Sequence, residues 1–181
     1  MTEADRVRWD VRYARAGPAP VGDAGPPPLF APHEHLFPTD GLAMEVACGR
    51  GRGAFWLAGR GLEVWGFDVS AVAVRLAREL AAQHGVGDRC RFDVVDLDDG
   101  LPEGAPVDLI VCHLFRDPRL DQAMIERLVP GGLLAIAVLS EVDVGPGPFR
   151  AAPGELRAAF AQLDVAAEGE RRGEAWLLAR A

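Results

Sequence analysis

The chain has 181 residues, a formal net charge of −8 and 49% hydrophobic residues, which predicts a single soluble domain with a sizeable core. The acidic balance argues against a nucleic-acid partner held through phosphate contacts and favours a small-molecule partner. All 19 basic residues are arginines, so a Schiff-base lysine and a phosphate-loop lysine are both excluded.

Residues that bind metals do not cluster in the sequence. The histidines His33 and His35 have no further ligands nearby, so we expect no metal site. The cysteines also lack metal-ligand spacing, and we expect them to be reduced core thiols of a cytoplasmic protein. They are Cys48, Cys90 and Cys112.

No segment of the sequence predicts a membrane partner. The first residues are charged and lack the apolar core of a signal peptide. The longest purely apolar run, at 133–139, is too short to cross a bilayer.

The N-terminal segment differs in composition from the rest. Residues 3–16 are predicted to form a short helix, on which three side chains lie close together: Trp9, Arg12 and Tyr13. Residues 17–38 hold seven of the fourteen prolines, a density that interrupts any continuous helix or central strand. This predicts a mobile or extended linker. We therefore divide the chain into a cap helix and linker at 1–41 and a main domain at 42–181.

A glycine-rich loop opens the main domain. The apolar run 42–47 has the length of a buried strand, and it stops at Gly49-x-Gly51-x-Gly53. A helix at 53–60 is predicted to follow, with Phe55 and Leu57 or Ala58 facing inward. Glycines suit this tight turn and let a ligand approach the backbone. A second strand at 62–68 ends on a carboxylate, an arrangement typical of nucleotide-cofactor sites.

Strands and helices alternate through the rest of the chain. The predicted elements are a helix capped by Ser70 and ending at Gly85, strands at 91–95 and 107–112, a helix opened by Asp117-Pro118, a strand at 133–139 after Pro130-Gly131-Gly132, a helix at 154–162, and short strands at 163–167 and 175–179. This alternation predicts an α/β, doubly wound, Rossmann-like sheet that is mostly parallel. The last two strands predict a C-terminal antiparallel hairpin, for seven strands in all.

Four motifs follow one another in a specific order: Glu45-x-Ala47-Cys48-Gly49-x-Gly51-x-Gly53, Gly66-Phe67-Asp68-Val69-Ser70, Asp96-Leu97 and Leu128-Val129-Pro130-Gly131-Gly132. In these motifs the chain, from about residue 42 to its C-terminus, resembles the class I S-adenosylmethionine-dependent methyltransferases. Glu45 stands where aspartate is commoner in that family, and Ala47 replaces a frequent glycine. The opening Trp9-Asp10-x-Arg12-Tyr13 is similar to small bacterial members related to tellurite-resistance and thiopurine methyltransferases.

The resemblance implies S-adenosylmethionine as cofactor and a site built from matching residues. The implied cofactor-binding residues are Glu45, Ala47, Cys48, Gly49, Gly51, Gly53, Asp68, Val69, Asp96, Leu97 and His113. Asp68 would accept hydrogen bonds from both ribose hydroxyls. We expect this contact to be exposed, so that Asp68→Ala would remove cofactor binding and leave the fold intact. Asp96 would bind the adenine amino group. Val69 would stack near the adenine, and Leu97 would cover its ring.

The implied reaction is an in-line methyl transfer to a small molecule. Because the sulfonium centre is a strong electrophile, the protein mainly aligns the acceptor and excludes water. A general base is needed only for a poorly ionised acceptor, and His113 is the candidate; its alternative role is to line the pocket. Tyr13 is a second catalytic candidate. Arg12, Tyr13 and Glu141 are expected to touch substrate, although Glu141 equally fits a solvated loop acid.

Two other classes of function compete with this interpretation. A nicotinamide-dependent oxidoreductase is possible because Gly49-x-Gly51-x-x-Ala54 also satisfies the dinucleotide fingerprint, with Asp68 about twenty residues on. Against it, the chain leaves little room for a substrate domain. A cofactor-binding protein without catalysis would share the same fold. The methyl acceptor and the oligomeric state are left open.

Overall fold

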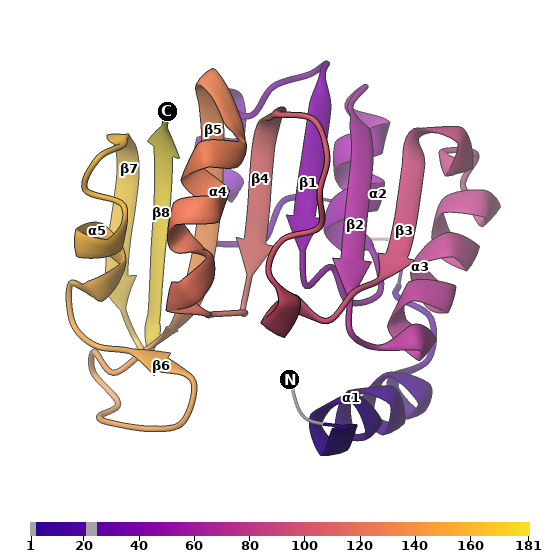
Figure 1. The fold of residues 1–181 in the computed structure, drawn as a ribbon, viewed down its shortest axis with the longest axis horizontal. Coiled ribbons are helices and arrows are strands. Elements are labelled where there is room, and N and C mark those ends of the chain that lie inside the picture. Colours follow the sequence, from indigo (N-terminus) through magenta and orange to yellow (C-terminus); the bar gives the residue numbers. More distant parts are fainter. Residues whose placement is uncertain (1–2, 21–24) are drawn as a thin grey trace.

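The computed structural model describes residues 3–20 and 25–181, and its centre is one mixed sheet in the order β3-β2-β1-β4-β5-β8-β7 (Figure 1). The strands are β1 (Leu42–Val46), β2 (Glu63–Asp68), β3 (Cys90–Val94), β4 (Val107–His113), β5 (Leu128–Ser140), β6 (Arg150–Ala151), β7 (Asp164–Arg171) and β8 (Glu174–Arg180). Strands β1 to β5 pair in parallel, and β8 pairs antiparallel with β5 and β7. The predicted Rossmann-like sheet and its terminal hairpin are confirmed.

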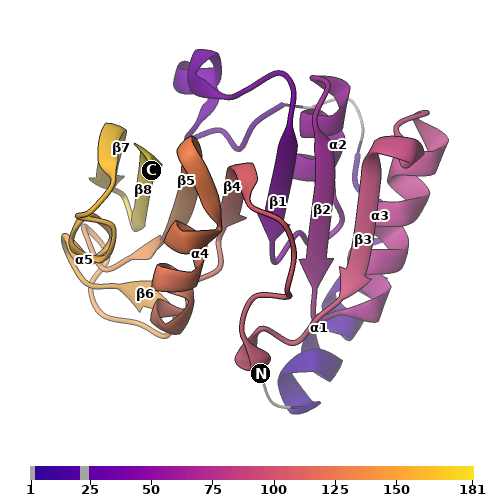
Figure 2. The same ribbon diagram turned by 45° about the horizontal axis from the view of Figure 1, so that its top comes forward.

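Helices cover both faces of this sheet (Figures 1 and 2). They are α1 (Glu3–Ala16), α2 (Arg52–Gly59), α3 (Ala71–Gln83), α4 (Asp121–Arg127) and α5 (Glu155–Ala159). Side chains alternate across a strand, so in β4 Leu109 and Val111 pack in the cluster with α2 and α3, whereas Ile110 packs in the cluster with α4 and α5. In the described part of the chain, no helix is both long and apolar enough to cross a membrane.

Several predicted details need correction. The sheet has an eighth strand, because the two-residue β6 pairs with the end of β5. Strand β5 begins at Leu128, so the Pro130-Gly131-Gly132 motif lies within it, beside a register shift against β4. In α2 it is Trp56, 8% exposed, that is buried with its neighbours, whereas Phe55 is only half-buried.

The proline-rich segment is not the mobile or extended linker that its composition predicts, at least outside residues 21–24, which lie beyond the described part. A 3-10 helix spans Ala31–Leu36. The flanking Phe30 and Phe37 are 0% and 3% exposed and join the core cluster of α2 and α3. The Phe37 ring packs at 5.2 Å from that of Trp56. Buried phenylalanines at both ends of the 3-10 helix therefore fix this segment to the sheet.

Candidate active site

The sequence-predicted site residues gather at one edge of the sheet. Because β1, β2 and β4 are parallel, their carboxyl ends lie together, at the bottom in Figure 1. The glycine loop, residues 47–53, follows β1 at this edge, and α1 lies beside it. This edge therefore brings the N-terminal helix beside the glycine loop of the main domain.

The glycine loop has a backbone that side chains would disrupt. Gly49 and Gly51 have φ of +53° and +74°, and even Ala47 has φ +53°. A Cβ on Gly51 would lie 2.7 Å from the Cβ of Ala77 in α3. A Cβ on Gly53 would lie 2.1 Å from Oε1 of Glu45. The loop is thus packed tightly between β1 and α3.

Glu45 fastens this loop to the start of α2. Its side chain is 6% exposed, and its Oε2 accepts a hydrogen bond of 2.8 Å from the backbone N–H of Ala54. Burial raises the pKa of Glu45 to about 8, opposed by the N–H groups of Ala54 and Gly53, which stabilise the ionised form. Glu45 therefore stabilises the conformation of the glycine loop. A contact between Glu45 and the cofactor is implied by the resemblance alone.

The raised pKa of Glu45 predicts a specific pH dependence of stability. A folded-state pKa of about 8 against an ordinary 4.5 means that the unfolded state releases the proton first, so the free energy of unfolding falls as pH rises between these values. We expect Glu45→Gln to be flatter than the wild type over this interval in urea unfolding experiments. Exposed Glu63 in β2 supplies the control, Glu63→Gln, and equal slopes in all three proteins would contradict the prediction.

Asp68, at the end of β2, is more enclosed than the sequence predicts. It is 5% exposed; its Oδ2 accepts from Gly49 N–H and its Oδ1 from Ser70 N–H, both at 2.9 Å. Burial raises its pKa, although these two N–H groups act in the opposite direction. The expectation of an exposed contact was wrong, because Asp68 also ties the glycine loop to the start of α3. The Val69 N–H also bonds to this carboxylate, but a carboxylate offers about four lone-pair sites, so Asp68 can still accept from a ligand hydroxyl.

Helix α1 docks on this edge through contacts that sequence reasoning missed. Asp10 Oδ1 accepts a 2.5 Å hydrogen bond from the hydroxyl of Ser70, which itself caps α3 by accepting from Ala73 N–H at 3.1 Å. Arg50 of the glycine loop donates to carbonyls at the end of α1, including that of Gly17 at 2.9 Å. The polar residue types were visible in the sequence, but their partners lie 33 and 60 residues away.

The same docking places Tyr13 over the glycine loop. A Cβ on Gly49 would lie 3.0 Å from the Tyr13 hydroxyl oxygen. Burial, followed by the nearby charge of Asp68, raises the pKa of Tyr13 above its ordinary value, so its hydroxyl is protonated near neutral pH. The guanidinium of Arg12 lies 4.9 Å from the ring of Trp9. Tyr13 is therefore an α1 side chain that lies directly against the predicted cofactor loop.

The other predicted cofactor-binding residues differ in how exposed their side chains are. Val69 and Leu97 are 5% and 3% exposed, and Leu97 packs in the core cluster of α4 and α5. Asp96 is half-buried and accepts from Asp98 N–H at 3.0 Å, a bond that lowers its pKa. Cys48 is buried, and burial raises its thiol pKa well above the ordinary value. Of these side chains, only Asp96 is both charged and accessible.

His113 is the last residue of β4 and is half-buried at the same edge. Burial, and then the positive charge of Arg52 in α2, lower its pKa from the ordinary 6.5. The imidazole is therefore neutral near pH 7 and able to accept a proton. Glu141 lies just after β5 and is half-buried, with its backbone N–H bonded to the Ala151 carbonyl at 3.0 Å.

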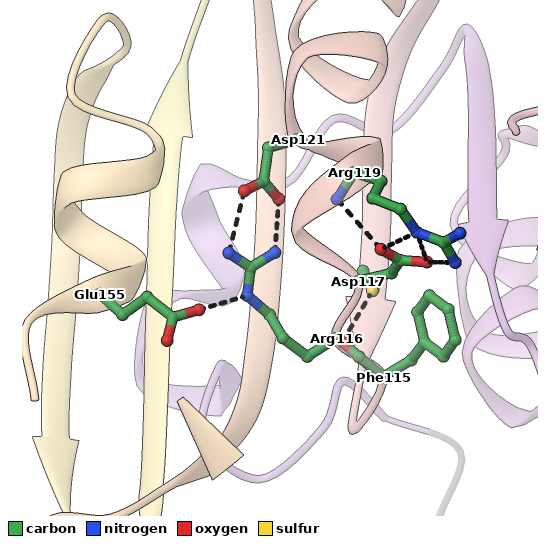
Figure 3. A network of polar contacts seen from close by, with 7 residues as sticks. Phe115, Arg116, Asp117, Arg119, Asp121 and Glu155 are labelled. Atoms are coloured by element: carbon green, nitrogen blue, oxygen red, sulfur yellow. Dashed lines mark hydrogen bonds and ion pairs between the residues drawn. The ribbon is translucent and has the colours of Figure 1, made fainter. Parts of the chain in front are cut away.

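The loop after His113 is anchored by a buried arginine (Figure 3). The side chain of Arg116 is 7% exposed, and its guanidinium meets both carboxylate oxygens of Asp121 at 2.5 and 2.9 Å. It also donates to Glu155 of α5 at 3.1 Å. Leu114, just ahead of this anchor, has φ +59° and is 51% exposed. The network holds an exposed apolar residue beside His113 in a strained conformation.

Within the described residues, no group of three or more histidine, cysteine, aspartate or glutamate side chains is arranged to hold a metal ion. His33 instead packs its ring 5.0 Å from that of Trp176.

Comparison with known proteins adds a family match over the same segment. Residues 43–132 match a family model described as "Methyltransferase domain". This range begins in β1 and ends in β5, so it includes the glycine loop, Asp68, Asp96 and His113. The match covers the part of the chain in which the site residues lie.

Similar proteins are found both among curated sequences and among solved structures. The methyltransferase GfsG of Streptomyces halstedii is 33% identical over an alignment of 129 residues that covers 65% of this chain and 45% of GfsG. An uncharacterized protein of a Synechococcus strain is 31% identical over 176 residues, which cover 87% of this chain and 40% of that protein. The chain therefore spans less than half the length of these two curated relatives. Among solved structures, TehB from Haemophilus influenzae superposes with a TM-score of 0.73 at 18% identity, covering 95% of this chain and 66% of TehB. The [4+2]-cyclase SpnF gives 0.74 at 16% identity, covering 97% and 92%.

Proposed function

Since the chain belongs to the class I S-adenosylmethionine-dependent methyltransferases, we propose that it transfers a methyl group from S-adenosylmethionine to a small-molecule acceptor. The observation that carries the proposal is the hydrogen bond from Gly49 N–H to the Asp68 carboxylate. It joins Asp68 to the glycine loop at the carboxyl ends of parallel strands. The net charge of −8 supports a small molecule over a nucleic acid as the acceptor.

The residues at this edge fit the chemistry of the cofactor. The methionine part would lie along the backbone of the glycine loop, where Gly49 and Gly51 present no side chain. The free lone pairs of Asp68 would accept from the ribose hydroxyls, and half-buried Asp96 would accept from the adenine amino group. Val69 and Leu97 would contribute only through their surfaces, because both side chains are almost wholly buried.

The chain's contribution to the reaction is mainly positioning. When bound, the cofactor supplies an electrophilic methyl group, and the protein holds the acceptor in line and excludes water. Tyr13 over Gly49 and His113 at the end of β4 are the polar side chains we place next to the reacting atoms. Tyr13 remains protonated and donates a hydrogen bond to the bound ligand. His113 is neutral and takes up the proton that the methylated substrate releases.

This role of His113 predicts a kinetic effect. We expect His113→Gln to lower kcat by about 10²- to 10⁴-fold, the usual contribution of a general base, and to lower the affinity for S-adenosylhomocysteine far less. Because burial lowers the pKa of His113, the wild-type rate should fall only below the ordinary histidine pKa of 6.5. A kcat that His113→Gln leaves unchanged would assign the residue to packing alone.

The proposal is tested first by calorimetric titration with S-adenosylhomocysteine, with NADH and NADPH in parallel. We expect only the sulfur nucleotide to bind. Binding of a nicotinamide nucleotide instead would support the oxidoreductase alternative, because Gly49-x-Gly51-x-x-Ala54 also fits that fingerprint. Since a [4+2]-cyclase has the same fold, transfer of a radiolabelled methyl group to an acceptor must then be measured directly. A protein that binds cofactor but never transfers the label would favour the non-catalytic alternative.

A further inference from the structure

A line of aromatic rings leads away from the glycine loop. Tyr13, over Gly49, stacks on Trp9 with ring centroids 5.6 Å apart and an interplanar angle of 25°. The guanidinium of Arg12 lies 4.9 Å from the Trp9 ring. That of Arg8 lies 6.0 Å from the Trp9 ring and also 6.0 Å from the ring of Phe149. We call these five side chains the aromatic wall.

Phe149 is an unusual member of this wall. It is 72% exposed, more than any other large hydrophobic residue described, and its backbone has φ +62°. Exposing a phenylalanine forgoes its burial energy, and the left-handed region adds backbone strain to a bulky residue. Such combined costs cluster where a side chain contacts a ligand. Nothing within the described fold stabilises the ring in return except the loose contact with Arg8.

The loop that carries Phe149 is held firmly at its base. Arg150 donates to the carbonyls of Ser140 at 2.6 Å and Gly173 at 3.2 Å. The backbones of Ser140 and Gly173 are bonded at 2.8 Å, and Arg172 N–H is bonded to the Asp143 carboxylate at 2.7 Å. The hairpin of β7 and β8 therefore fixes the position from which Phe149 projects toward α1. A ring held in this way needs little ordering when a ligand binds.

The charge on the wall is positive. Among the described residues, Arg8 has one acidic partner, Asp5, at 3.0 Å, and its side chain is 57% exposed. For Arg12, the described residues provide the Trp9 ring and no carboxylate within ion-pair distance. At 6.0 Å from both rings, the Arg8 guanidinium is at the limit of cation–π contact. Its exposed side chain can therefore turn from Asp5 toward a ligand anion and leave the ring faces to another flat group.

We propose that the aromatic wall binds the methyl acceptor, and that this acceptor is a planar aromatic compound carrying a negative charge. The inference rests on the proposed methyl transfer, since the wall begins at Tyr13 beside the predicted cofactor loop. The acceptor's ring packs against Trp9 and Phe149, and its anionic group pairs with Arg12 and Arg8. The nucleophilic atom then lies at the Tyr13 end, closest to the cofactor.

Binding experiments on the full chain saturated with S-adenosylhomocysteine test this proposal. The probes are hydroxylated benzoates and naphthoates, each beside its ring-saturated acid and its uncharged phenol, measured by saturation-transfer NMR and calorimetry. We expect the aromatic acids to bind best. Phe149→Ala should weaken them by about five- to tenfold through loss of a ring contact. Arg12→Gln should weaken the acids by about tenfold and leave the phenols unchanged.

The control is Arg75→Gln, an exposed arginine on α3 that pairs with Glu79 at 2.7 Å and is not part of the aromatic wall, and it should leave all affinities unchanged. The proposal is overturned if no aromatic acid binds better than its saturated and uncharged counterparts, or if Phe149→Ala and Arg12→Gln bind like the wild type. Failure of S-adenosylhomocysteine to bind would instead overturn the proposed function itself. The two failures are therefore distinguishable within one set of titrations.

Discussion

Asp68→Ala is expected to lower the affinity for S-adenosylhomocysteine by about 100-fold or more, since two charge-assisted hydrogen bonds to the ribose are lost. The same change should lower the free energy of unfolding by about 2–4 kcal/mol, because the N–H groups of Gly49 and Ser70 lose their buried acceptor. Both effects come from one carboxylate that supports the loop and faces the proposed ribose position. Calorimetry and urea unfolding measure them separately.

The control for Asp68 is an acid on the neighbouring strand. Asp93 in β3 accepts a 2.8 Å hydrogen bond from the indole N–H of Trp65, and its side chain is 32% exposed. Asp93→Ala should therefore reduce stability modestly and leave the affinity unchanged. Asp68→Asn can keep one of the two backbone bonds and should be intermediate in stability. An Asp68→Ala protein that is folded and binds like the wild type would contradict the assignment of the ribose site.

Local signals in the sequence predicted the elements around the site well. The α3 helix follows from apolar residues spaced by four and from the Ser70 cap, both of which act within a few residues. The eighth strand could not be predicted in this way, because two residues carry no alternation and β6 exists only by pairing with β5. The start of β5 was misplaced for a similar reason: pairing between Leu128 and Val107 extends the strand through a motif that usually marks a turn.

The candidate site was predicted in its residue types but not in their contacts. Spacing identified Glu45 and Asp68, yet not that both carboxylates are bonded to backbone N–H groups of the loop. The buried Phe30 and Phe37 show the same limit, since prolines predicted the break in secondary structure but not the packing. Phe149 gave no signal, because its exposure and its approach to Arg8 depend on how a loop after β5 meets the first helix.

Arg116→Leu is expected to lower the free energy of unfolding by about 3–5 kcal/mol, the usual cost of removing one partner from a buried ion pair. The guanidinium is almost wholly buried, and Asp121 and Glu155 would lose their common partner, with 15% and 33% of their side chains exposed (Figure 3). Burial opposes the charge of Arg116, but the hydrogen bonds and negative charges of Asp121 and Glu155 together outweigh it and raise the pKa of Arg116. Urea unfolding of the purified variant measures this effect.

A nearby surface arginine supplies the comparison. Arg119, with a side chain 65% exposed, pairs with Asp98 and Asp117 at 2.6 Å, and Arg119→Leu should lower the free energy of unfolding far less than Arg116→Leu, because solvent screens exposed ion pairs. A triple variant, Arg116→Leu with Asp121→Asn and Glu155→Gln, also removes the two unpaired carboxylate charges. It should recover most of the lost stability, because the penalty comes from those unpaired carboxylates. A triple variant no more stable than Arg116→Leu would place the loss in packing instead. Because Arg116 also anchors the loop that carries Leu114, Arg116→Leu should raise the KM for the acceptor more than it weakens cofactor binding.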